Sequence, residues 1–365
     1  MPLNPTHDKP MKRSNRAYLF LLILILFSSL GLSDSTLEVT GKVANHIINP
    51  SFEQHGALSY RHWGLFSRIP GWQADQGDIE IQHKRAGGIY AFDGLAKLEL
   101  DARSNSTLYQ QIDTKAEQYY SLDLYYSPRV KRRGTDSNNA EIIWNNTVLD
   151  VLTGDKQYWH YTHFDVYSDS LQADLELAGA GTSDGLGALI DALKLTETPY
   201  TSLNLVQNGS FEQTGALNKQ DKSEFNAIPG WVATQGKIKL LAHKKGRRYA
   251  AEGISKLKLD NHKINVHIEQ TLATEAGKRY QLSLSYAPIK NQQNSDNVQV
   301  FWNNTLLKTL QGDRGSWRRY AFDVSADSDT SLLALYGAGR ADHTGGHIDD
   351  VRLYSLPYVS ENLIE

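Results

Sequence analysis

Short stretches in which apolar and polar residues alternate recur along most of the chain. The clearest are residues 97–101, 120–126 and 174–177, and later residues 237–240, 256–260 and 280–286. Alternation with a period of two, interrupted by turn residues, is typical of half-buried antiparallel strands. No window keeps a helical period beyond about two turns. The pattern therefore predicts an all-β protein built from antiparallel β-sandwich (jelly-roll) domains.

One segment near the N-terminus departs from this alternation. The apolar run Ala17–Leu32 follows the basic residues Lys12, Arg13 and Arg16, which is the pattern of a secretory signal peptide. The run is shorter than the roughly 20 residues that span a bilayer comfortably. We expect residues 1–33 to be a signal segment and the protein to be secreted, periplasmic or on the cell surface. The alternative is an uncleaved signal anchor, and only then would the chain contact a membrane.

The rest of the chain is an internal duplication with a period of about 159 residues. Asn49-Pro-Ser-Phe-Glu53 returns as Asn208-Gly-Ser-Phe-Glu212, and Ile69-Pro-Gly-Trp72 returns as Ile228-Pro-Gly-Trp231. Pro followed by Gly predicts a tight turn in which the glycine takes a positive φ.

Two similar domains follow from this duplication. The first repeat covers residues 43–197 and the second covers residues 202–355, and a tail of residues 356–365 remains. Between Asn45 and Glu197 there are 13 basic and 21 acidic residues, whereas between Asn204 and Ser355 there are 20 basic and 15 acidic residues. The two repeats therefore carry charges of opposite sign on one predicted fold.

Composition excludes several classes of function. The chain has no cysteine, which rules out disulfides, thiolate metal sites and thiol nucleophiles. With 38 basic and 41 acidic side chains, a net charge of −3, the whole chain is not a basic nucleic-acid binder. We therefore expect no nucleic-acid partner.

The ordered motifs resemble those of galactose-binding-domain-like jelly rolls, in particular exported carbohydrate-binding modules that begin with Asn-Gly-x-Phe-Glu and end with Ile-Asp-(Asn/Asp)-Val. They are also similar to a plant cell-wall domain family of uncharacterised function that shares the Ile-Pro-Gly-Trp motif. Both repeats show this resemblance nearly end to end. It is specific for the fold and much less so for a ligand, because jelly rolls support many functions.

The resemblance implies a structural calcium ion in each repeat. In the resembling modules, the Glu of the first motif and the Asp of the last strand bind calcium together with backbone carbonyls. These positions correspond to Glu53 with Asp191, and to Glu212 with Asp349. Calcium prefers six to eight oxygen ligands, so the chemistry is suitable. The alternative is that each carboxylate accepts hydrogen bonds from the backbone at a strand end.

Carbohydrate binding by a β-sandwich needs aromatic faces that stack on sugars. Six of the seven tryptophans recur at equivalent places in both repeats, which indicates a structural role, and only Trp63 has no partner. Tyr60, Tyr109 and Tyr158 are likewise unpaired aromatics of the first repeat. We take these four residues as candidates for ligand contact, with coverage of the core edge as the alternative for Trp63.

These observations favour an exported, non-catalytic protein that binds a glycan or a cell-surface polysaccharide. A structural or adhesive surface protein with a protein partner is the competing hypothesis. A polysaccharide lyase or glycosidase is a third, because some jelly rolls are enzymes. Glycoside hydrolysis needs two carboxyl groups that face one another across a cleft, and no acidic pair stands out in the sequence.

Overall fold

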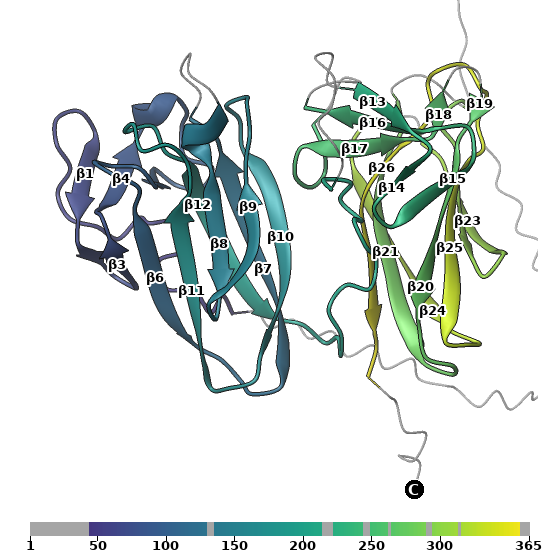
Figure 1. Ribbon diagram of the computed structural model, residues 1–365, viewed down its shortest axis with the longest axis horizontal. Coiled ribbons are helices and arrows are strands. Elements are labelled where there is room, and N and C mark those ends of the chain that lie inside the picture. The colour runs from purple at the N-terminus through teal and green to yellow at the C-terminus, as the bar shows by residue number, and fades with distance from the viewer. Residues whose placement is uncertain are drawn as a thin grey trace, which may run out of the picture. The chain divides into compact units, whose positions relative to one another are not determined.

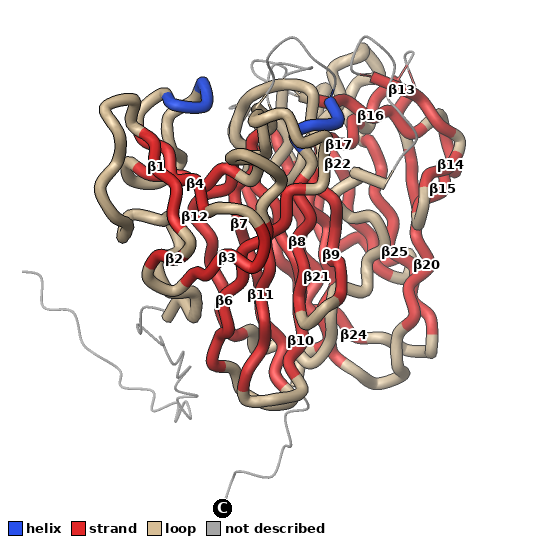
Figure 2. Tube along the Cα trace, turned by 60° about the vertical axis from the view of Figure 1, so that its left-hand side comes forward, coloured by secondary structure: helices blue, strands red, loops and turns tan. Residues whose placement is uncertain are grey.

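The computed structural model describes residues 44–129, 135–213, 222–243, 249–261, 264–289, 294–312 and 315–357. The predicted signal segment lies outside the described residues, as does most of the predicted tail. Figure 2 shows strands through most of the described chain, and the helical structure in it consists of two short 3-10 turns, η1 (Ala86–Gly88) and η2 (Thr135–Asn138). No helix among the described residues is long and apolar enough to span a bilayer. The all-β prediction is confirmed.

The first repeat consists of two six-stranded antiparallel sheets (Figure 1). The first sheet has the order β1 (Trp63–Phe66), β4 (Ile79–His83), β5 (Ala96–Glu99), β12 (Leu189–Glu197), β7 (Gln118–Ser127) and β10 (His160–Ser168). The second sheet has the order β2 (Arg68–Ile69), β3 (Trp72–Gln76), β6 (Thr107–Asp113), β11 (Gln172–Gly179), β8 (Ala140–Trp144) and β9 (Thr147–Leu152). Strands distant in sequence are neighbours in both sheets, as expected for a jelly-roll sandwich.

The second repeat has the same arrangement. Its first sheet has the order β13 (Lys222–Phe225), β16 (Ile238–Ala242), β17 (Ser255–Lys258), β26 (His347–Ser355), β21 (Arg279–Ala287) and β24 (Arg318–Ser325). Its second sheet has the order β14 (Ala227–Ile228), β15 (Trp231–Gln235), β20 (His267–Ala273), β25 (Thr330–Gly337), β22 (Val298–Trp302) and β23 (Thr305–Leu310). A separate two-stranded pair joins β18 (Asp260–Asn261) to β19 (Ile264–Asn265).

The repeated motifs build the same corner in both repeats. Gly71, with φ of 81°, completes the two-residue turn between β2 and β3, in which Ile69 lies opposite Trp72. The side chain of Asn49 donates to the carbonyl of Pro70 in that turn at 3.2 Å, and the carbonyl of Asn49 accepts the indole N–H of Trp72 at 3.3 Å. The predicted Pro-Gly turn is thus confirmed, and the Asn of the first motif joins it to the start of the repeat.

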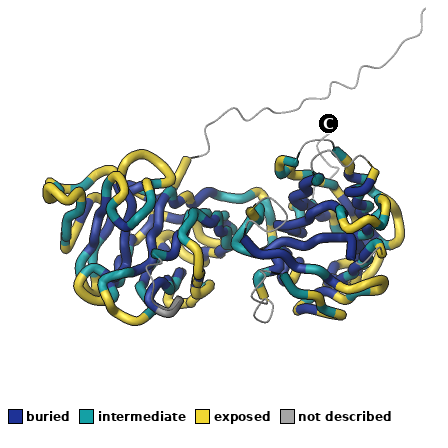
Figure 3. The backbone as a smooth tube through the Cα atoms, turned by 90° about the horizontal axis from the view of Figure 1, so that it is seen from above, coloured by how far each residue is buried: buried dark blue, intermediate teal, exposed yellow. Residues whose placement is uncertain are grey.

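Each repeat has its own hydrophobic core, and Figure 3 shows the buried residues of the described chain in dark blue. Trp72 is 1% exposed and packs on Phe52 with 5.6 Å between ring centroids; Trp231 packs on Phe211 in the same way, at 5.8 Å. Truncating such a buried tryptophan to alanine costs about 3–5 kcal/mol. Trp72 and Trp231 therefore serve the fold, as their recurrence predicted.

Candidate functional site

A polar surface of the first repeat lies on the outer side of strands β4 and β5. Strict alternation directs Ile81 and Leu98 into the core, so that Glu80, Gln82 and Glu99 face away from it. These three polar residues are nevertheless at least 92% buried. A half-buried strand would leave them in water, so their burial requires that they are hydrogen-bonded.

The three side chains form one network with an arginine from the loop after β7. Glu80 lies directly opposite Glu99 in the sheet, and the amide of Gln82 donates to both carboxylates, at 2.7 and 3.3 Å. The guanidinium of Arg129 donates to Glu99 Oε1 at 2.7 Å, and the backbone N–H of Gly187 donates to the same oxygen at 2.7 Å.

The electrostatics of this network favour a proton on one of the acids. Burial, together with the charge of neighbouring Glu80, raises the pKa of Glu99 to about 8, although Arg129 opposes both effects. Two carboxylates side by side in a buried place do not readily ionise together. At neutral pH, the carboxyl group of Glu99 is therefore mostly protonated while it accepts the hydrogen bond from Arg129.

Trp63 lies at the edge of this network, on strand β1 and directly opposite Gln82. A cleft of about 460 Å³ opens here; its lining residues include Arg61, Trp63, Leu65, Glu80, Gln82, Gly87, Arg103 and Arg129. We call it the Trp63 cleft. The other six tryptophans each donate their indole N–H to a backbone carbonyl. Trp63 donates to no residue that the structure describes, so its N–H is available.

Two further polar atoms of the Trp63 cleft have no partner among the described residues. They are Oε1 of Gln82, an acceptor, and Nε of Arg129, a donor, and both atoms are buried. Leaving such a group unsatisfied costs about 1–3 kcal/mol. The cleft thus presents the ring and the indole N–H of Trp63 at its surface, and an unpaired acceptor and an unpaired donor lie buried in its lining.

The other three predicted aromatics do not line the Trp63 cleft. Tyr60 is 83% exposed, and its hydroxyl accepts from Arg61 at 2.9 Å, so it lies beside the cleft's rim. Tyr158 is half-buried, and its ring packs on His160 with 3.8 Å between centroids. The structure therefore brings Tyr60 near Trp63 but does not bring Tyr158 there.

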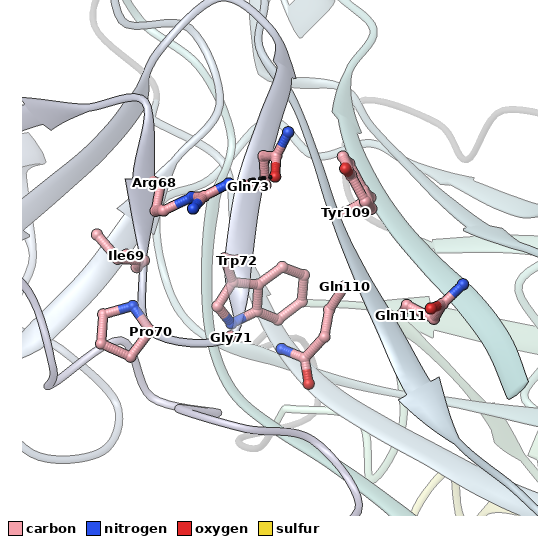
Figure 4. A pocket seen from close by; sticks show the side chains of 9 residues that line it. All are labelled: Arg68, Ile69, Pro70, Gly71, Trp72, Gln73, Tyr109, Gln110 and Gln111. Atoms are coloured by element: carbon pink, nitrogen blue, oxygen red, sulfur yellow. Dashed lines mark hydrogen bonds between the residues drawn. The ribbon is translucent and has the colours of Figure 1, made fainter.

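Tyr109 lines a separate hollow of about 550 Å³ on the outer face of the second sheet (Figure 4). It projects from β6 opposite Gln73 of β3. Arg68 already donates to Gln73 at 2.9 Å, and Trp72 is buried beneath. Because Arg68 and Gln73 already bond to one another, these two side chains are less available to a ligand than the unpaired groups of the Trp63 cleft are.

The second repeat carries different chemistry at the equivalent positions. Lys239 lies opposite Lys258 on β16 and β17, where the first repeat has Glu80 opposite Glu99. Burial, together with the charge of Lys239, lowers the pKa of Lys258 to about 8. The difference in net charge between the repeats is thus present at corresponding positions of one sheet face.

The predicted calcium residues hold a loop in each repeat. Glu53 Oε1 accepts two backbone N–H groups from the C-terminal end of loop 92–96, at 2.6 and 2.7 Å. Asp191 Oδ2 accepts two backbone N–H groups from the N-terminal end of the same loop, at 2.7 and 3.1 Å. Glu212 and Asp349 hold loop 251–255 with the same four bonds.

The charge of these carboxylates suits a cation, but there are too few of them to fill its coordination sphere. Burial raises the pKa of Asp191 to about 7, that of Glu212 to about 7, and that of Asp349 above its usual range, so negative charge is poorly compensated. Oε2 of Glu53 and of Glu212 accepts no hydrogen bond from the described residues. Yet no cluster of three or more acidic or histidine side chains with metal-binding spacing occurs among those residues. A calcium ion would need backbone carbonyls or water as additional ligands.

The sequence analysis missed one acid at each of these loops. Asp93 accepts the hydroxyl of Ser51 at 2.7 Å, and its charge helps to raise the pKa of Asp191. Glu252 takes the same place in the second repeat, and burial raises its pKa to about 8. The signal that could have found them is an acid one residue before the paired glycines, Gly94 and Gly253.

Most of the second repeat matches a known sequence family. A family model described as a protein of unknown function (DUF642) matches residues 204–353. The multifunctional-autoprocessing repeats-in-toxin of Vibrio cholerae serotype O1 is 24% identical over 204 residues, 54% of this chain and 4% of the toxin. The toxin of the same name from Vibrio vulnificus is 24% identical over 265 residues, 62% of this chain and 5% of the toxin. The chain thus spans a very small part of these relatives.

Solved structures with similar folds are distant. The tandem CBM22 domains of Xyn10C from Paenibacillus barcinonensis are 10% identical, with a TM-score of 0.29, over 86% of this chain and 98% of that chain. The ANX2 ectodomain from Arabidopsis thaliana is 9% identical, with a TM-score of 0.31, over 78% of this chain and 90% of that chain. Similarities this low carry no argument about function, which depends on the site itself.

Proposed function

We propose that the protein is an exported glycan-binding protein and that the Trp63 cleft of its first repeat is the binding site. The observation that carries this proposal is the coincidence of a half-buried indole with three unused polar atoms: the indole N–H, Gln82 Oε1 and Arg129 Nε. A sugar ring has apolar C–H faces that stack on an aromatic ring, and hydroxyls that both donate and accept. A pyranose would stack on the indole and accept its N–H, and it would reach Gln82 Oε1 and Arg129 Nε only by displacing the residues that cover these two buried atoms.

Binding is favoured over catalysis by the state of the acids. Glu99 is fully buried, and its two oxygens accept from Arg129, Gly187 and Gln82. A glycosidase acid has to reach the glycosidic oxygen, and its partner has to reach the anomeric carbon or a water molecule. Glu99 is better suited to positioning Gln82 and Arg129 for a ligand.

Export is the second element of the proposal. It rests on the basic and then apolar sequence of residues 1–33, and a polysaccharide of a cell surface is the class of partner that an exported protein would meet. Calcium in each repeat is the third element: it would neutralise the buried carboxylates at loops 92–96 and 251–255 and so stabilise the two ends of each domain.

A glycan array with the purified protein tests the proposal. We expect binding to one class of oligosaccharide, and the variant Gln82→Leu, which installs the residue of the second repeat at this position, should lose it. The matched control is Gln73→Leu in the Tyr109 hollow, which should retain binding. Absence of binding to any glycan, with capture of a protein partner instead, would favour the adhesive alternative. Turnover of a bound polysaccharide that Glu80→Gln abolishes would favour an enzyme.

A further inference from the structure

Two histidines of the first repeat meet outside the Trp63 cleft. His55 follows the first motif, and His83 ends strand β4. Their Nε2 atoms lie 2.9 Å apart, and the rings are nearly perpendicular, with centroids 4.8 Å apart. Both side chains are partly exposed.

The protonation of His55 is set by its neighbour. Its Nδ1 lies 2.6 Å from the carbonyl oxygen of Gly56. A carbonyl oxygen only accepts, so Nδ1 carries the proton and Nε2 presents a lone pair. A backbone carbonyl on the far nitrogen is the usual means by which proteins orient a metal-binding imidazole.

His83 can supply the second lone pair by a change of tautomer. In the structure, with Nε2 of His55 as the acceptor, Nε2–H of His83 is the donor of the hydrogen bond between the two rings. Moving that proton to Nδ1 of His83 leaves one lone pair on each Nε2, with no change in the charge of either ring, and a rotation of the two rings would direct both lone pairs at one ion. The pair therefore exists either as a hydrogen bond or as two ligands of one cation.

We propose that His55 and His83 form a binding site for a divalent late first-row transition metal, Cu²⁺ or Ni²⁺, with water in the remaining positions. Imidazole suits these ions. Two nitrogens about 2.1 Å from one ion lie about 3.0 Å apart when the angle between them is 90°, and about 3.4 Å apart in a tetrahedron. The observed spacing of 2.9 Å matches the right angle of square-planar or octahedral coordination.

This site belongs to the first repeat alone. Thr214 and Ala242 occupy the positions that correspond to His55 and His83, so the pair is not a requirement of the fold. It is also distinct from the proposed calcium sites, which offer oxygen ligands. A bound ion would join the segment after the first motif to the end of β4.

Titration of the purified protein with NiCl₂ and with CuCl₂ by calorimetry tests the site. We expect one saturable site per chain that His55→Gln and His83→Gln each weaken at least tenfold, about 1.4 kcal/mol. His267→Gln is the matched control, because His267 stacks on Tyr336 and has no histidine partner among the described residues; it should leave binding unchanged.

The Cu²⁺ electron paramagnetic resonance spectrum gives a second readout that does not depend on affinity. We expect the hyperfine pattern of two coordinated imidazole nitrogens, reduced to one in either single variant. Failure to saturate either ion, or a pattern unchanged in both variants, would overturn the proposal and leave the pair as a hydrogen bond only.

Discussion

Glu53 and Asp191 hold opposite ends of the same loop, although one belongs to the first motif of the repeat and the other to its last strand. Glu53 accepts the backbone N–H of Ala96 at 2.7 Å, and Asp191 accepts that of Phe92 at 2.7 Å. Gly94 lies between them, and a Cβ at that position would come within 2.3 Å of Glu53 Oε1. The loop therefore depends on both carboxylates and on the absence of a side chain at its centre.

The first prediction concerns this loop. Asp191→Ala leaves two N–H groups without their acceptor, which costs about 2 kcal/mol locally. We expect the amides of Phe92 and Asp93 to exchange with deuterium about 30-fold faster by NMR or mass spectrometry. The corresponding amides of Ala251 and Glu252 serve as an internal control and should not change. Equal protection in the variant and the wild type would show that Asp191 does not hold the loop.

The second prediction concerns calcium. Saturating calcium at about 100 times its Kd would contribute about 2.7 kcal/mol to stability. We expect EDTA to lower the Tm, and added Ca²⁺ to restore it. The double variant Glu53→Gln with Glu212→Gln should have a Tm that no longer responds to EDTA. A wild-type Tm that is the same with and without EDTA would contradict calcium binding.

The third prediction follows from the raised pKa of Glu99. Its pKa of about 8 in the folded protein exceeds the unfolded value of 4.5, so the folded state binds more protons than the unfolded state between these values. The free energy of unfolding therefore falls as pH rises from about 5 to 8. Glu99→Gln removes this contribution, and the difference in Tm between pH 5 and pH 8 should shrink.

Thermal unfolding of both proteins at the two pH values is the measurement. The control is Glu141→Gln on strand β8, a half-buried residue outside the network. If Glu99→Gln and the wild type lose the same stability between pH 5 and pH 8, Glu99 is ionised in the folded protein and the account of its electrostatics is wrong.

The sequence predicted much of the fold because its signals are local or repeated. The Pro-Gly turn needs only Gly71 at a positive φ, and the alternation around Leu98 needs only one strand. The duplication separated structural tryptophans from Trp63, since the internal copy served as a reference.

The sequence could not predict the chemistry of the cleft. Alternation assigns Glu80, Gln82 and Glu99 to the outer face of the sheet but does not say that loops distant in sequence cover them. The burial of these three side chains depends on Gly87, where a Cβ would lie 2.2 Å from Gln82 Oε1. It depends also on Arg129, which reaches back from the loop after β7. The contact of Arg129 with Glu99 is non-local, so neither spacing nor composition indicates it, and alternation within the strand does not predict the turn at Gly87.

The most direct test of the central claim is the affinity of Trp63→Ala for the oligosaccharide that the array identifies. Lys222→Ala is the matched control, because Lys222 lies opposite Leu241 as Trp63 lies opposite Gln82. Loss of the stacking ring should weaken binding at least tenfold by calorimetry, about 1.4 kcal/mol, while the control keeps the wild-type Kd. An unchanged Kd in Trp63→Ala would contradict the assignment of this cleft as the glycan site.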